Sequence, residues 1–197
     1  MSSDQDKDIF RFLGKLNCQN LHMFNDEATG LKAIVAIHNT NLGPSLGGCR
    51  CFPYQSTYDA VVDAVRLAQG MTFKSAAAGL DLGGGKSVII ADPKEINHRK
   101  DFFKSFGKFV DSLGGRYITA VDMGTTAEDM DVVSTQTKHV TCHNSAIYKY
   151  KDPSPIISHG VFRAIQASQK FCSGSDSLEG VKVNVQGLGH VGYNMMK

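Results

Sequence analysis

Two lysines, each ending a short glycine-containing motif, are the residues of this chain best suited to chemistry. Lys74 ends the segment GMTFK at residues 70–74, and Lys86 follows three consecutive glycines at residues 83–85. Glycine lets a backbone approach a ligand closely, and a lysine held there is either a point charge for a carboxylate or, once desolvated, a general base. Amino-acid chemistry uses one lysine of each kind.

Two further motifs flank the lysines. Residues 42–50 read LGPSLGGCR, and residues 118–125 read ITAVDMGT. In this order and spacing, the four motifs resemble those of the Glu/Leu/Phe/Val dehydrogenase family, with the leucine dehydrogenases most alike. The resemblance runs from about residue 10 to the last residue and covers the N-terminal half of the family's length.

The resemblance implies roles for the two lysines and for one aspartate. It implies that Lys74 holds the α-carboxylate of the substrate and that Lys86 is the catalytic base. Asp122 matches the aspartate expected to orient the substrate amino group and assist proton transfer. A structural role for Asp122, capping the turn or helix that follows it, is compatible with the catalytic one.

The residues around the paired glycines bear on the choice of substrate. The resemblance implies that Gly47 and Gly48 form a loop where the backbone meets the substrate, and that Met71 lines the side-chain pocket. The resemblance places Leu46 at a position where glutamate dehydrogenases have a lysine that can pair with the side-chain carboxylate of the substrate. Because an apolar residue cannot neutralise a second carboxylate, and burying one unpaired is costly, we expect an apolar, monocarboxylic substrate such as leucine.

A second glycine motif near the end of the chain points to a dinucleotide. Gly187, Gly189 and Gly192 form a G-x-G-x-x-G pattern, which is weak evidence alone but stronger after a strand and before a helix. Residues 181–186 alternate between apolar and polar side chains as a strand does. We therefore expect these glycines to bind NAD. The acidic residue expected about 20 positions further on for the ribose lies beyond this sequence.

The elements that position these residues follow from hydrophobic periodicity and from turn signals. We expect a helix that starts at Ser56 and ends at Gly70 or just beyond, so that Lys74 lies at its C-terminal end. A glycine loop is expected to lead Lys86 into a strand. Asp122 is expected just past a short strand. The other predicted helices cover residues 5–16, about 102–113, from 126 onward and 157–171, and the predicted strands cover residues 31–38, 87–91, 117–120 and 181–186.

These elements predict an α/β protein in two parts. A mixed-sheet substrate domain is expected over residues 1–143. A linker and a truncated Rossmann-type NAD-binding domain are expected over residues 144–197, because residues 144–155 are polar and contain two closely spaced prolines.

Composition excludes several classes of partner. The chain has 197 residues, 42% of them hydrophobic, with 21 basic and 19 acidic residues and a net charge of +2. This balance suggests neither nucleic acid nor a membrane surface as a partner. The polar N-terminus and five cysteines without a framework spacing indicate a cytoplasmic protein with reduced thiols. No metal site is expected, since Cys49 and Cys51 lack a second ligand pair at zinc spacing.

The expected function is NAD-dependent oxidative deamination of a small apolar L-amino acid to its 2-oxo acid and ammonia, by a homo-oligomer in the full-length form. Two alternatives stay open: a truncated, inactive remnant of such an enzyme, and a non-catalytic amino-acid-binding module. Three positions favour the remnant because they depart from the family pattern where cofactor and substrate meet, namely Val121, Asp152 and Ile157.

Overall fold

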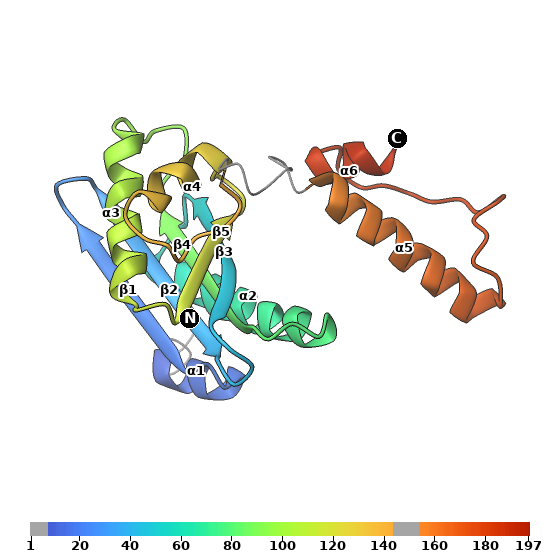
Figure 1. Cartoon of the computed structure of the whole chain (residues 1–197), viewed down its shortest axis with the longest axis horizontal. Coiled ribbons are helices and arrows are strands. Elements are labelled where there is room, and N and C mark those ends of the chain that lie inside the picture. The colour runs from blue at the N-terminus through green and yellow to red at the C-terminus, as the bar shows by residue number, and fades with distance from the viewer. Residues whose placement is uncertain (1–7, 144–153) are drawn as a thin grey trace, which may run out of the picture. The chain divides into compact units, whose positions relative to one another are not determined.

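The computed structural model describes residues 8–143 and 154–197 (Figure 1). The chain divides into two compact units, Met1–Tyr148 and Lys149–Lys197, which are described separately. The expected connection at 144–155 falls largely outside the described residues, and so does Asp152.

The first unit is built on a five-stranded mixed sheet in the order β1-β2-β4-β3-β5. Strands β1, β2 and β4 pair antiparallel, whereas β3 pairs parallel with both β4 and β5. This confirms the predicted α/β class with a mixed sheet. The strands are β1 (Asn20–Asp26), β2 (Leu31–Asn39), β3 (Ser45–Phe52), β4 (Gly83–Ile90) and β5 (Tyr117–Val121).

Helices cover both faces of this sheet (Figure 1). Helix α2 (Thr57–Ala77) packs on one face, where its alanines and valines form a core with β2 and β4, and α1 (Ile9–Leu16) adds partly buried residues to that core. Helices α3 (Arg99–Ser112) and α4 (Ala127–Ser134) cover the other face. The phenylalanines of α3 are buried there, which confirms the predicted amphipathic helix.

Helix α2 starts as predicted but ends later. The Ser56 side chain accepts a hydrogen bond from the Asp59 backbone and caps the helix, which continues through Gly70 to Ala77. The predicted end near Gly70 is therefore wrong, and Lys74 lies within the last turn of the helix. Gly84 on β4 lets this part of the helix lie close to the sheet, since a Cβ at Gly84 would strike the backbone nitrogen and hydroxyl of Thr72.

Both sets of adjacent glycines lie in strands, so the predicted loops are wrong. Gly47 and Gly48 belong to β3, and Gly83–Gly85 open β4. A Cβ at Gly47 would collide with the Gly85 carbonyl, and one at Gly85 would meet the Tyr117 ring. These glycines let neighbouring strands and an aromatic ring pack closely, and this geometric need gives no signal in hydrophobic periodicity.

The second unit contains α5 (Ser154–Ser173) and α6 (His190–Met195). Helix α5 starts before the predicted residue 157, because a proline is tolerated in a first helical turn. Residues 181–186 do not form the predicted strand; the described part of this unit offers no second strand for pairing. No helix in the described ranges is long and apolar enough to cross a membrane.

Candidate active site

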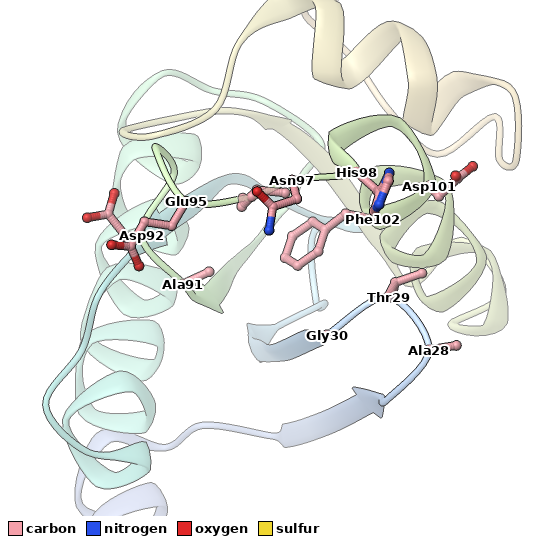
Figure 2. A pocket seen from close by; sticks show the side chains of 11 residues that line it. Ala28, Thr29, Gly30, Ala91, Asp92, Glu95, Asn97, His98, Asp101 and Phe102 are labelled. Atoms are coloured by element: carbon pink, nitrogen blue, oxygen red, sulfur yellow. The ribbon is translucent and has the colours of Figure 1, made fainter.

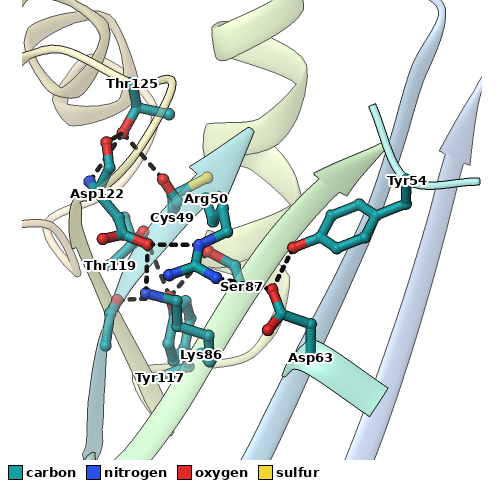
Figure 3. Close-up of polar contacts among 11 residues, drawn as sticks. Cys49, Arg50, Tyr54, Asp63, Lys86, Ser87, Tyr117, Thr119, Asp122 and Thr125 are labelled. Carbon is teal, nitrogen blue, oxygen red and sulfur yellow. Dashed lines mark hydrogen bonds and ion pairs between the residues drawn. The ribbon is translucent and has the colours of Figure 1, made fainter. Parts of the chain in front are cut away.

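Lys86 is a buried charge on the face of the sheet that α2 covers. Lys86 lies two residues from Gly84 and from Val88 along β4, so all three share one face of the sheet, and Val88 packs in the core beneath α2. Lys86 is only 5% exposed. Its Nζ lies 2.7 Å from Oδ2 of Asp122 (Figure 3), so the structure brings together two residues expected to act together.

The turn after β5 presents Asp122 to this lysine. The Asp122 backbone N–H donates to Thr125 Oγ1 at 2.9 Å, and that hydroxyl donates to the Cys49 carbonyl at 2.9 Å. The absence of a side chain on Gly48 makes room for the aspartate, since a Cβ there would come within 2.8 Å of the Asp122 Cβ. The paired glycines are therefore needed for the site, although they lie in a strand.

Arg50 is a second cation on the same aspartate, and sequence reasoning did not assign it a role. Its Nε donates to Asp122 Oδ2 at 3.1 Å, and its Nη1 donates to Asp63 Oδ2 at 2.9 Å. The Tyr54 hydroxyl donates to the same Asp63 oxygen at 2.5 Å. Lys86, Asp122, Arg50 and Asp63 thus form a chain of alternating charges (Figure 3).

These contacts set the ionisation of the aspartate. Burial alone would raise the pKa of Asp122, but Lys86 and Arg50 together outweigh it and hold the pKa below its usual value. Burial would lower the pKa of Arg50, yet Asp122 and Asp63 raise it overall. Asp122 is therefore an acceptor at neutral pH that could hold a substrate amino group.

Tyr117 supports the paired glycines from the opposite face of the sheet. Its hydroxyl donates to the Gly47 carbonyl at 2.6 Å and lies 2.9 Å from Ser87 Oγ. The residue is fully buried, and burial raises its pKa. The phenol therefore remains a neutral donor that fixes the backbone of β3 beside Lys86.

The exposed flank of the site lies over β3. Leu46, Gly48 and Arg50 alternate with buried residues and are partly accessible on the α2 face of this strand. Lys86 and Asp122 border the same face. The sheet thus presents an apolar side chain and bare backbone along β3, beside a buried ion pair between β4 and the turn after β5. This arrangement suits a small ligand with an apolar side chain and an amine.

Helical geometry places Lys74 on the flank of α2 that faces this strand. Lys74 follows Asp63 by eleven residues, which is about 20° from three complete turns, so the two share one stripe of the helix. Asp63 contacts Arg50 of β3. Because Thr72 meets Gly84, whose partner on β3 is Leu46, Lys74 belongs to the Leu46 end of the site. Lys74 is exposed and Met71 partly buried.

A separate cavity of about 460 Å³ lies between the β1–β2 turn and the segment that joins β4 to α3 (Figure 2). Asp92, Glu95 and Asp101 line it together with His98. Three carboxylates would repel the carboxylate of an amino acid. Because none of the residues expected to bind substrate lines this cavity, the face over β3 remains the candidate site.

The predicted cofactor glycines lie in the second unit. Gly187 has a φ of 89°, a left-handed conformation that favours glycine. A Cβ at Gly192 would strike the Gly187 carbonyl, whereas one at Gly189 would meet nothing within 4 Å. The motif leads into α6, as expected. Gly187 thus serves a tight turn and Gly192 allows close packing, whereas Gly189 borders open space.

The family model for the Glu/Leu/Phe/Val dehydrogenase dimerisation domain matches residues 16–139. The chain belongs to this family. It is 47% identical over 190 residues to leucine dehydrogenase of Bacillus subtilis (strain 168), covering 96% of this chain and 52% of that protein. Leucine dehydrogenase of Thermoactinomyces intermedius is 49% identical over 189 residues, covering 96% of this chain and 51% of that protein.

Solved structures of the dehydrogenase family share the fold. The crystal structure of L-tryptophan dehydrogenase from Nostoc punctiforme matches with a TM-score of 0.74 and 40% identity, covering 95% of this chain and 53% of that one. A hetero-hexameric glutamate dehydrogenase from Thermus thermophilus matches in fold with a TM-score of 0.71 at 21% identity, covering 98% of this chain and 52% of that one. The chain spans about half the length of the curated relatives it matches.

Proposed function

We propose that this chain carries the substrate-binding and proton-transfer residues of an NAD-dependent L-amino-acid dehydrogenase that acts on leucine or a related apolar amino acid. The observation that carries the proposal is the buried Lys86 ammonium, 2.7 Å from Asp122, beside the accessible face of β3. A buried lysine paired with a carboxylate at a partly open site is typical of proton-transfer chemistry. The leucine dehydrogenase relatives support the same assignment.

The substrate is proposed to lie along β3 between the two lysines. Lys74 pairs with the α-carboxylate from α2, and Asp122 accepts a hydrogen bond from the amine. Gly47 and Gly48 present bare backbone to the substrate, while Leu46 and Met71 contact its side chain. An apolar residue at position 46 offers no charge to a second carboxylate, so glutamate is disfavoured relative to leucine.

In the proposed reaction, this chain's residues orient the substrate and move its protons. Asp122 would fix the amine and so orient the α-carbon hydrogen for transfer. NAD, which the glycine motif of residues 187–192 would hold, would supply the hydride acceptor when bound. Lys86, as the neutral amine, then takes a proton from water as the water attacks the iminium carbon of the substrate. Return of that proton to the departing amine, while Lys86 takes the proton of the new hydroxyl as the carbonyl forms, leaves the 2-oxo acid and ammonia.

The second unit is proposed to contribute to NAD binding. The left-handed φ at Gly187, the close approach at Gly192 and the open space at Gly189 fit the tight turn of a dinucleotide motif. On this basis we propose residues 144–197 as the linker and the start of a Rossmann-type domain, and residues 1–143 as the substrate domain. The family description of a dimerisation domain supports a homo-oligomer.

Calorimetry with L-leucine, L-glutamate and NAD tests the proposal on the purified chain, and absorbance of NADH tests turnover. Leucine should bind more tightly than glutamate, and Lys74→Ala should weaken leucine binding. Leucine binding without NAD binding or turnover would favour the amino-acid-binding module. No binding of leucine at concentrations that saturate the leucine dehydrogenase relatives would overturn the proposed substrate.

A further inference from the structure

Arg50 is a cation of the site that joins two carboxylates. Its Nε contacts Asp122 and its Nη1 contacts Asp63, at 3.1 and 2.9 Å. The planar guanidinium holds both contacts in a fixed geometry, which a lysine ammonium cannot reproduce. Tyr54 then donates to Asp63 from the far side, so the arginine is held at both ends.

Both cations contact the same oxygen of Asp122. Lys86 Nζ and Arg50 Nε each lie within hydrogen-bond distance of Oδ2. A general base must lose its proton before it can accept one, so Lys86 is neutral for part of the proposed reaction. During that interval the lysine no longer neutralises Asp122. Arginine stays protonated in proteins, and Arg50 therefore remains as a permanent counter-charge.

We propose that Arg50 is a positioning residue that keeps Asp122 ionised and oriented while Lys86 gives up its charge, and that Asp63 and Tyr54 hold Arg50 in place. The need for such a counter-charge rests on the proposed function, because only a proton-transfer role makes Lys86 change its charge. The ion pairs themselves exist without substrate. They can be tested without turnover.

The groups that face Asp122 come from every surrounding element. Lys86 lies on β4, Arg50 on β3 and Asp63 on α2, with Tyr54 in the segment between β3 and α2. Cys49 is also near, but burial raises the pKa of its thiol, so it stays neutral. Arg50 is thus the only cation besides Lys86 that contacts the Asp122 carboxylate among the described residues.

The test follows the side-chain carboxyl carbon of Asp122 by NMR as a function of pH, in the purified chain without substrate. Asp122→Asn assigns the signal. Arg50→Gln should raise the midpoint pH of the Asp122 titration. Arg50→Lys should raise that midpoint less, because an ammonium keeps the charge but cannot hold both carboxylates in the planar geometry of a guanidinium. The matched control Arg116→Gln makes the same charge change at the exposed opposite end of β5 and should leave the midpoint unchanged.

Tyr54→Phe keeps the ring that packs edge-on against Phe52 but removes the hydroxyl that holds Asp63. Tyr54→Phe should slightly raise the midpoint pH of the Asp122 titration. If Arg50→Gln does not fold, Tyr54→Phe still tests the same chain of contacts. A midpoint in Arg50→Gln or Tyr54→Phe equal to that of the unmodified chain would overturn the proposal. So would an equal rise in Arg116→Gln, which would indicate a general effect of charge.

Leucine binding measured separately keeps the two hypotheses apart. If the midpoints follow the expected order but leucine does not bind, the positioning role of Arg50 stands and the proposed function fails. If leucine binds and the midpoint pH of Asp122 is the same in Arg50→Gln as in the unmodified chain, the proposed function stands and the positioning role fails.

Discussion

Lys86 is buried and paired with Asp122. The turn after β5 fixes the position of that aspartate. Sequence reasoning predicted Lys86 and Asp122 because the motifs that contain them resemble those of the dehydrogenase family. It did not predict the Arg50–Asp63–Tyr54 chain, which joins residues of β3, of α2 and of the segment between them. Hydrophobic periodicity describes which face is buried. It carries no information about which polar side chains meet across elements.

The two lysines should separate kinetically. In a chimera that adds the part of a leucine dehydrogenase relative not spanned by this chain, Lys86→Ala should lower kcat by about 10²–10⁴-fold, the usual contribution of a general base. Lys74→Ala should mainly raise KM, because it removes a contact with the carboxylate that does not react. Steady-state kinetics with leucine and NAD measure both. The control is Lys108→Ala, an exposed lysine of α3 on the other face of the sheet; kcat of Lys86→Ala near that of the control would identify another base.

Leu46 gives a test of substrate choice. In the same chimera, Leu46→Lys should improve glutamate relative to leucine by about 1–3 kcal/mol in kcat/KM, because a cation would then face the side-chain carboxylate. Other walls of the pocket stay apolar and limit the gain. Leu46→Met is the volume-matched control and should keep the leucine preference. An unchanged glutamate-to-leucine ratio in Leu46→Lys would show that position 46 does not face the substrate side chain.

At the scale of elements, the sequence predicted the amphipathic helices better than the strands of the site. The Phe-rich pattern of α3, the Ser56 cap of α2 and the Thr126 start of α4 were all confirmed. Strands β1 and β3 were not predicted, and the glycines of β3 and β4 were expected in loops. A strand whose glycines serve close packing lacks the β-branched and aromatic residues on which strand prediction depends.

The close approach of α2 to β4 predicts opposite effects for two glycines. Gly84→Ala should destabilise the first unit by about 1–3 kcal/mol, since a Cβ there would strike the Thr72 backbone and force strands or helix apart. Gly70→Ala is the control: it lies inside α2 with nothing within 4 Å of a Cβ, and should stabilise by up to about 1 kcal/mol. Urea unfolding followed by circular dichroism measures both. A Gly84→Ala variant as stable as Gly70→Ala would show that the helix can move away at no cost.

For the molecule as a whole, the mixed sheet explains how residues from distant segments form one site. Parallel pairing of β3 with β4 and with β5 brings Arg50, Lys86 and Asp122 to one region, although 72 residues separate the arginine from the aspartate. The α/β class and the position of Asp122 just past the end of β5 were predictable from the sequence. The order of strands was not, because periodicity within a strand says nothing about its neighbours.

The charges of the site also make the stability of the first unit depend on pH. The pKa of Asp122 is lower in the folded chain than its ordinary value, so its contribution is fully present well above about pH 4 and is lost as the pH falls through the folded value. Asp122→Asn removes that contribution and leaves the buried Lys86 ammonium without its partner. Near neutral pH the variant should therefore be less stable, by about 1–3 kcal/mol for a pair that is partly exposed.

Below about pH 4 the difference between the unmodified chain and Asp122→Asn should narrow, because the carboxylate that distinguishes them becomes protonated in the unmodified chain as well. Urea unfolding at a series of pH values measures the two free energies of unfolding. Asp81→Asn, which removes an exposed carboxylate, gives the reference for the change in net charge. A difference that stays constant or widens as the pH falls would mean that Lys86 and Arg50 do not stabilise the ionised form of Asp122, and the ionic basis of the proposed site would be lost.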